Sequence, residues 1–377
     1  MIERTERGGV TSGTLSSVPP PNPGGPGFVA RHRVKLLLSA VITVLLIYSL
    51  QKGGLSLVPQ RSDFHRVKWW VVAAYLVPLL VMHYFRAVRW RYLLRSIAVV
   101  PRRRILAVSW VGFAAILLLP FRLGEFVRPV MIRQKGVISG SAATGTIVAE
   151  RVVDGLYLSA VLAVALVLVP HIEPLPEKVV GFPISVAQVR ASGFLMLGVF
   201  LAAFVVIGVY YFARAWAHRL TLAVFGLVSP RLGEKLAGMA ERLADGLHFF
   251  SRGRDAAGFL LETSFYWGLN ALGMWILAWG CGVAHVDGSA ITFGETCALM
   301  GMLGITILIP GPPGLLGVFH LGIYAGMTMY FPTDIVTGPG SAYVFLLYSI
   351  QLVWHILAAT GFLLVDGGAL KKLRDEA

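Results

Sequence analysis

Long runs of apolar residues, separated by shorter polar stretches, dominate the sequence. The runs cover residues 34–50, 69–85, 105–119, 141–170, 192–212, 257–282, 290–309, 313–331 and 341–365. A helix needs about 20 apolar residues to cross a bilayer, and several runs reach that length. Runs such as GLYLSAVLAVALVLV do not alternate with period two, unlike the strands of a membrane β-barrel. The pattern predicts an all-α integral membrane protein, because helices satisfy their own backbone in lipid.

Two of the apolar runs lead into helix-breaking residues. The run 105–119 is short and enters Pro120 and a charged stretch, and the run 290–309 enters IPGPPGLLG. Proline and glycine at such density end a helix. We therefore predict a helical hairpin at each place. The predicted turn residues are Pro120, Gly124, Pro310, Pro313, Gly314 and Gly317.

The basic residues predict how the runs are oriented. The formal charge is +14, and arginine and lysine gather around residues 31–35, 85–104, 133–135, 213–254 and 371–374. Cytoplasmic loops are rich in these residues. All five groups can be cytoplasmic if both hairpins are re-entrant and enter from opposite faces. The sequence then predicts about six full transmembrane helices plus two oppositely oriented re-entrant hairpins, with both termini cytoplasmic. Broken helices in corresponding halves are typical of inverted-repeat transporters.

Composition divides the chain into a membrane domain and two tails. Residues 1–30 are rich in Gly, Pro and Ser and predict a disordered cytoplasmic tail. Residues 31–368 form a single polytopic domain, and 369–377 a second cytoplasmic tail. Within that domain, an amphipathic cytoplasmic segment, 213–256, joins the first half, 31–212, to the second, 257–368.

The composition also excludes several classes of function. Hydrophobic residues make up 56% of the chain and charged residues only 14%, where a soluble domain carries about a quarter charged. The positive charge lies in loops rather than on a basic face interleaved with aromatics, so we expect no nucleic-acid partner. Neither of the two cysteines has metal-site spacing, and no P-loop lysine is present. We expect no metal and no cofactor.

A charged stretch follows the first helix break. LLLPFRLGEFVRP places Arg122, Glu125 and Arg128 within seven residues. The planar fork of arginine binds two phosphate oxygens at once, so Arg122 and Arg128 are candidate ligands of a lipid phosphate. Glu125 lies three residues from each and can neutralise one of them in a helical turn. Alternatively, the arginines extend to the cytoplasmic surface.

A second charged group, in VAERVVDGL, opens an otherwise apolar run. Glu150 and Asp154 share one face of a helix, and Arg151 lies between them. Ionisable residues inside a membrane are costly and indicate function. We expect the two carboxylates to pair with Arg122 or Arg128 and assign Arg151 as a third phosphate ligand. Alternatively, these residues form a charge cluster at the membrane interface.

The second half offers neutral and weakly basic polar residues instead. His320 follows the Pro/Gly cluster and is either a proton-responsive group or a hydrogen-bonded structural residue. Glu262 and Asn270 share a helix face, as do Gln351 and His355. These four residues either line a cavity or form hydrogen bonds between helices.

Together these motifs resemble the lysylphosphatidylglycerol synthase transmembrane family, which includes the flippase domain of MprF-type proteins and relatives of the YbhN and AglD type. The resemblance covers about residues 35–365. Its first motif, G-x7-P-x-R-x-G-E-x2-R, begins at Gly112, and its second, E-R-x2-D, begins at Glu150. It implies a prokaryotic membrane protein that handles phospholipids or polyprenyl-phosphate lipids.

The chain departs from the family pattern in three ways. Ile116 stands where the family often has Asn, Leu315 stands where the family has Gly, and His320 stands where the family has Glu. An acidic residue would suit a cationic lysyl headgroup better than His320 does. Only about a dozen residues follow the last apolar run, so we expect that this chain does not itself make lysyl-lipid.

The resulting hypothesis is a flippase that moves a phosphate-containing lipid between the leaflets of the cytoplasmic membrane of a prokaryote. One alternative is a membrane-embedded transferase, with Glu125 or Asp154 as general base. Another is a non-catalytic assembly protein. We prefer transport to catalysis because no donor-binding fold is visible. Membrane lipids are the expected partners, and a homo-oligomer and a separate lipid-modifying enzyme remain open.

Overall fold

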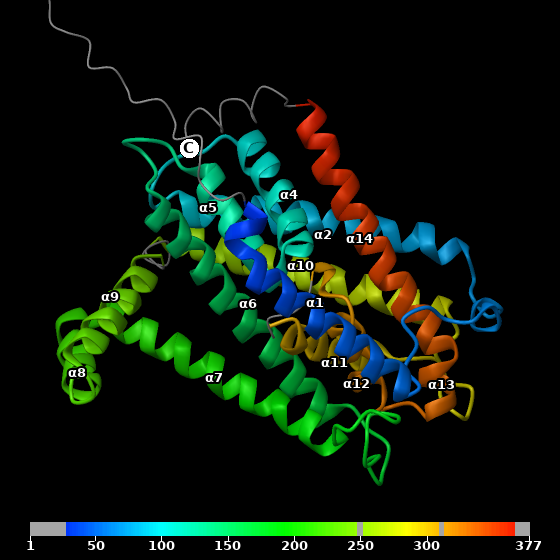
Figure 1. Cartoon of the computed structure of the whole chain (residues 1–377). Helices are drawn as coiled ribbons and strands as arrows, with labels where there is room; N and C mark the ends of the chain where they lie inside the picture. The colour runs from blue at the N-terminus through cyan, green and yellow to red at the C-terminus, as the bar shows by residue number, and fades with distance from the viewer. Residues whose placement is uncertain (1–27, 247–251, 309–312, 366–377) are drawn as a thin grey trace, which may run out of the picture.

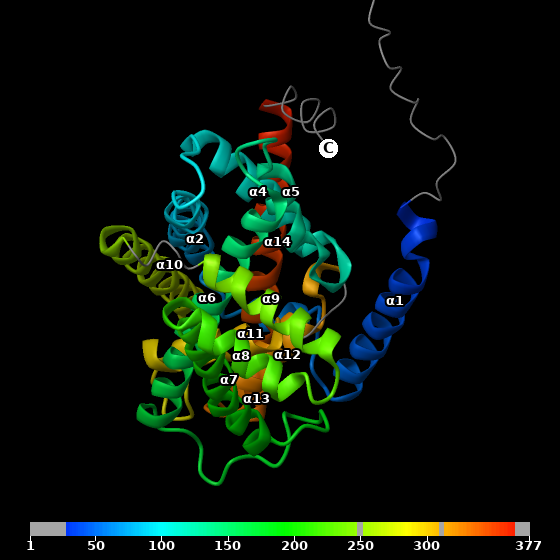
Figure 2. The ribbon, with the colours of Figure 1, turned by 90° about the vertical axis from the view of Figure 1, so that its left-hand side faces the viewer.

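The computed structural model describes residues 28–246, 252–308 and 313–365. Within this part of the chain, six helices have 19 or more residues. They are α1 (Phe28–Lys52), α2 (Trp70–Val88), α6 (Gly140–Leu168), α7 (Val186–Phe212), α10 (Gly253–Gly280) and α14 (Pro339–Val365). They form the body of the molecule, and Figure 2 shows α1 at its edge.

The outer surface of these helices is apolar. Four helical stretches are long and apolar enough to cross a membrane: Trp70–Leu94, Gly140–Leu168, Val186–Phe212 and Thr333–Leu364. On α7, Leu195, Val199 and Val205 are at least half exposed. An apolar surface of this extent is stable in lipid rather than in water. The structure is therefore that of an all-α membrane protein, as predicted, although the boundaries of the spans remain a prediction.

The first helix break forms a hairpin. Helix α4 (Arg102–Leu118) ends just before Pro120, a 3-10 helix (Pro120–Phe126) reverses the chain, and α5 (Val127–Ile132) returns beside α4. The start of α4 contacts the end of α5, because Arg104 Nη2 donates to the carbonyl oxygens of Ile132 and Arg133 at 3.4 Å. The hairpin thus begins and ends on one side of the molecule.

Gly124 allows the two arms of this hairpin to touch. A Cβ at Gly124 would lie 2.1 Å from the carbonyl carbon of Ala115 in α4. Because that atom is backbone, it cannot rotate away. We expect Gly124→Ala to destabilise the protein by at least about 3 kcal/mol, the upper end of ordinary overpacking. Thermal unfolding in detergent measures the effect.

Gly140→Ala is the matched control for that substitution. Gly140 opens α6, and a Cβ there would meet nothing within 4 Å. Alanine also favours helix over glycine by up to about 1 kcal/mol. The control should leave the melting temperature unchanged or raise it. Equal melting temperatures for the two variants would refute the close contact of the hairpin arms.

A second hairpin follows in the other half. It consists of α11 (Phe293–Thr306), a short 3-10 turn (Pro313–Leu315) and α12 (Val318–Met327). Gly314 and Gly317 have φ of 74° and 84°, values that favour glycine. His285 connects the start of α11 with the residues that follow α12. Its Nε2 lies 2.9 Å from Glu295 Oε1 in α11, and its ring stacks on Phe331 after α12. The predicted turn residue Pro310 lies outside the described residues.

The two hairpins point toward each other. In Figure 1, α4 and α5 lie in the upper part of the view and α11 and α12 in the lower part. Their tips are joined where Arg122 Nη1 donates to the carbonyl oxygen of Ile307 at 2.8 Å. Helix α14 contacts both hairpins, because its Trp354 packs against Trp110 of α4 and its Tyr348 packs against Phe319 of α12. That the hairpins are re-entrant in a bilayer remains a prediction.

The remaining elements surround this arrangement. Helix α3 (Trp90–Leu94) extends α2, α8 (Arg214–Phe225) and α9 (Pro230–Gly246) occupy the predicted linker between the halves, and α13 (Thr333–Thr337) precedes α14. The start of α1 and the end of α14 both lie toward the upper part of Figures 1 and 2. The predicted tails fall mostly outside the described residues.

Candidate functional site

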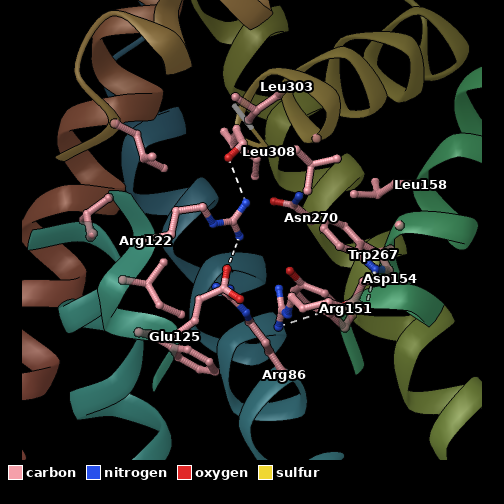
Figure 3. Close-up of a pocket in the computed structure, with 18 of the residues that line it drawn as sticks. Arg86, Arg122, Glu125, Arg151, Asp154, Leu158, Trp267, Asn270, Leu303 and Leu308 are labelled. Atoms are coloured by element: carbon pink, nitrogen blue, oxygen red, sulfur yellow. Dashed lines mark hydrogen bonds and ion pairs between the residues drawn. The ribbon is translucent and has the colours of Figure 1, made fainter. Parts of the chain in front are cut away.

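A cavity of about 510 Å³ lies between the two hairpins. Its walls come from both halves of the chain, with α2, α4, α6, α10, α11 and α14 all contributing side chains. Figure 3 shows charged groups on one side and leucines on the other. Leu158, Leu303 and Leu308 are among the apolar residues. The volume is typical of a ligand site.

Arg122 reaches into the cavity from the tip of the first hairpin. Its guanidinium pairs with Glu125, three residues later, and bonds to the Ile307 carbonyl of the second hairpin. The residue has φ of 57°, a left-handed conformation that is rare for a side chain of this size. The turn thus holds Arg122 in a costly conformation that places it between the hairpins (Figure 3).

The carboxylates of α6 form the centre of a charged network beside the cavity. Arg151 Nη2 lies 2.6 Å from Glu150 Oε1 and 3.5 Å from Asp154 Oδ2. Arg151 and Asp154 line the cavity, whereas Glu150 is fully buried behind them. Trp267 of α10 donates its indole N–H to Asp154 at 3.3 Å. The spacing of the two carboxylates places both on one helix face, as the sequence predicted.

Arg89, at the junction of α2 and α3, is the main partner of Asp154. Both terminal nitrogens of Arg89 donate to the two oxygens of Asp154 at 2.7 Å, and Thr263 accepts a further bond at 2.9 Å. The Arg89 side chain is fully buried. A bidentate pair of this kind fixes geometry as well as charge. Sequence reasoning had assigned Arg89 to a cytoplasmic loop.

Arg128 lies behind the cavity wall rather than among the residues that line it. Its Nη1 donates to both oxygens of Glu150 at 3.2 Å, and its guanidinium lies over the Trp90 ring at 4.2 Å. The side chain is 1% exposed. Gly112 provides the room, because a Cβ there would be 2.2 Å from Arg128 Cγ. In this position Arg128 is suited to hold Glu150 rather than to meet a ligand.

Arg86, one helical turn before Arg89, faces the cavity instead. Its guanidinium lies over the Phe113 ring at 4.2 Å, and its Nε has no hydrogen-bond partner. Among the described residues, no carboxylate oxygen comes within ion-pair distance of Arg86. A cation without a counter-ion in a partly buried site is costly unless a ligand supplies the opposite charge.

The charges of the site do not cancel. The cluster on this side of the cavity contains the arginines 86, 89, 122, 128 and 151 and the acids 125, 150 and 154. Five positive charges thus face three negative ones, which leaves two positive charges unmatched. In a site of low dielectric, this excess favours an anion.

The other predicted site residues divide between the cavity and its surroundings. Asn270, Gln351 and His355 line the cavity. Glu262 does not, and its side chain pairs with Arg91 and accepts from the Tyr92 hydroxyl at 3.1 Å. His320 is also outside the lining, 1% exposed and packed against the Tyr348 ring with centroids 4.8 Å apart.

The helical architecture and the buried charges define an integral membrane protein with an internal polar site. Comparison with protein families matches residues 34–360 to the family described as the lysylphosphatidylglycerol synthase TM region. The chain belongs to this family, which confirms the resemblance inferred from its motifs. No curated protein and no solved structure matches the chain.

Proposed function

We propose that this protein moves a phosphate-containing anionic lipid between the leaflets of a membrane, and that the lipid phosphate binds in the cavity at Arg86. The observation that carries this proposal is the cavity-facing Arg86 guanidinium, which has no carboxylate partner among the described residues. Membership in a family named for a lipid synthase is consistent with a lipid ligand.

The charged side of the cavity suits a phosphate group. Arg86 has no carboxylate partner in the described part of the chain, and Arg122 and Arg151 lie on the same side with their carboxylate partners (Figure 3). A phosphate diester supplies one negative charge and several acceptor oxygens, which match the guanidinium fork. The unmatched charge favours an anionic lipid over a zwitterionic one.

The opposite side of the cavity suits an acyl chain. Leu158 of α6, Leu303 of α11 and Leu308 lie across from the guanidinium groups (Figure 3). Phe200 of α7 and Phe126 of the first hairpin are further apolar residues of the cavity lining. A ligand that fits both sides has an anionic head and a hydrocarbon tail, which describes a phospholipid.

The position of the cavity between two opposed hairpins supports transport. Ligand sites of inverted-repeat transporters lie at the interface of the repeats, near broken helices. Here the hydrogen bond from Arg122 to the Ile307 carbonyl closes the contact between the tips. Opening on either side of that contact exposes the same arginines in turn, which is the requirement for alternating access.

A leaflet-accessibility assay tests the proposed function. The full chain is reconstituted in phosphatidylcholine vesicles that contain a trace of fluorescent phosphatidylglycerol, and dithionite then bleaches the label in the outer leaflet. Vesicles with protein should lose nearly all the fluorescence, and empty vesicles only the outer-leaflet share. Fluorescent phosphatidylcholine with the same chains should exchange more slowly, because it carries no net charge. Bleaching identical to that of empty vesicles would reject the proposal.

A further inference from the structure

Two histidines on the cavity wall share a hydrogen bond. His83 of α2 and His355 of α14 both line the cavity, and their Nε2 atoms are 3.1 Å apart. In each ring the other nitrogen, Nδ1, forms a hydrogen bond with a backbone carbonyl oxygen. His83 Nδ1 bonds to the Leu79 carbonyl oxygen at 2.9 Å and His355 Nδ1 to the Gln351 carbonyl oxygen at 2.6 Å.

These contacts determine how many protons the pair holds. A backbone carbonyl only accepts, so both Nδ1 atoms must carry hydrogen. Two neutral rings would then present bare lone pairs to each other across 3.1 Å. A hydrogen bond at that distance requires one additional proton on an Nε2. The three hydrogen bonds can form together only when the pair holds three protons on its four ring nitrogens and carries one positive charge.

An aromatic ring stabilises that charge. The ring of Trp110 in α4 stacks on His83 with centroids 5.7 Å apart and an angle of 15°. The negative face of an aromatic ring attracts a cation. Both histidines are almost fully buried, so the proton exchanges through the cavity rather than with bulk water.

Arg86 is the charged group nearest to the pair. It lies one turn after His83 on the same helix and lines the same cavity. The neutral titratable neighbours are Tyr75 of α2, whose hydroxyl accepts from Gln351, and Tyr266 of α10, whose ring lies 5.9 Å from the Arg86 guanidinium. Among the described residues, no carboxylate pairs with either histidine.

We propose that His83 and His355 form a proton-binding site that is linked to anion binding at Arg86, so that a lipid anion and a proton occupy the cavity together. The inference rests on the proposed function for its anion. A proton from water adds to the lone pair of one Nε2, and no covalent bond between heavy atoms changes. The phosphate offsets the repulsion between the protonated pair and Arg86.

Linkage makes the effect reciprocal. If the anion tightens proton binding by a given factor, the proton tightens anion binding by the same factor, and couplings of about 5- to 150-fold are typical. Anion affinity should therefore rise as the pH falls through the titration of the pair. Without the pair, this pH dependence should disappear.

The shared proton can be tested without any ligand. Solid-state NMR of the full chain labelled with ¹⁵N-histidine should show two rings with protonated Nδ1 and a proton shared between two Nε2 atoms. The signal should be lost in His83→Gln and in His355→Gln. It should persist in His320→Gln, which removes an equally buried histidine outside the cavity lining. Two neutral rings without a shared proton, observed over about pH 5 to 8, would overturn the assignment.

The linkage is tested by proton uptake. Dioctanoyl-phosphatidylglycerol is titrated into the detergent-solubilised full chain in two buffers of different ionisation enthalpy, and the difference in heat gives the protons bound per lipid. For couplings of about 5- to 150-fold, uptake should peak at about 0.4 to 0.85 proton per lipid. It should vanish in His83→Gln, which should still bind the lipid. Binding by the unmodified protein without uptake at any pH would overturn the linkage but leave the proposed function standing. No binding at all would reject the proposed function and the linkage together.

Discussion

Replacing Arg86 with glutamine is expected to slow leaflet exchange of fluorescent phosphatidylglycerol about 10- to 100-fold. Glutamine keeps much of the length of the side chain but removes the cavity-facing charge, which has no carboxylate partner among the residues that the structure describes. A hydrogen bond to a charged group contributes about 1.5–3 kcal/mol, and each 1.4 kcal/mol changes an equilibrium constant about tenfold. The loss should appear at sub-saturating lipid, where the rate depends on affinity.

Two further variants separate charge from geometry. Arg86→Lys keeps the charge but not the bidentate fork, so it should retain an intermediate rate. Arg103→Gln removes an exposed arginine at the start of α4, outside the cavity lining, and should behave like the unmodified protein. Equal rates for Arg86→Gln and Arg103→Gln would show that Arg86 does not hold the phosphate.

Replacing Asp154 with asparagine is expected to destabilise the protein by about 3–5 kcal/mol, the usual cost of breaking a buried pair. Asp154 binds both terminal nitrogens of Arg89 at 2.7 Å, and both side chains are almost fully buried. Without that carboxylate, Glu150 at 3.4 Å is the one acidic partner that Arg89 retains among the described residues. Thermal unfolding in detergent should show a large drop in melting temperature.

Asp255→Asn provides the matched comparison for this pair. Asp255 lies at the same distance, 2.7 Å, from Arg95, but the Arg95 side chain is 44% exposed. Its loss should cost less than that of Asp154, because the Arg95 charge stays in contact with water when its partner is removed. The double variant Arg89→Met with Asp154→Leu should regain much of the stability lost in the single Asp154 variant, because no buried charge is left unpaired at this contact. Equal destabilisation by Asp154→Asn and Asp255→Asn would contradict the buried network.

Much of the first hairpin could be predicted from local sequence. Pro120 follows directly after the end of α4, and only glycine fits at position 124, where the two backbones touch. The spacing of three between Arg122 and Glu125 predicted their ion pair, which the structure contains. These features depend on neighbours in the sequence, so the sequence carried enough information to find them.

Arg86 and Arg89 could not be placed in the same way. The basic block that follows the second apolar run predicts a cytoplasmic loop, because cytoplasmic loops are rich in arginine and lysine. In the structure α2 continues to Val88 and turns Arg86 toward the cavity and Arg89 toward α6. The carboxylate partners of Arg89, Glu150 and Asp154, lie 61 and 65 residues away, so only the packed helices reveal them. The one available signal was the spacing of three residues between His83, Arg86 and Arg89.

The role of Arg128 illustrates the same limit. Its motif suggested a phosphate ligand, and that assignment stays a prediction, but the structure shows its guanidinium enclosed by Trp90 and Glu150. A motif records which residues occur together, whereas contact with a ligand depends on which side of a helix faces the cavity. Arg122 and Arg128 differ in this respect although only six residues separate them.

The structure of the protein in nanodiscs of phosphatidylglycerol, determined by electron cryomicroscopy, tests the central claim most directly. Headgroup density should lie inside the cavity, with the phosphate within hydrogen-bond distance of the Arg86 guanidinium and the acyl chains along the leucine side. An empty cavity, or lipid density confined to the outer surface of the helices, would contradict it.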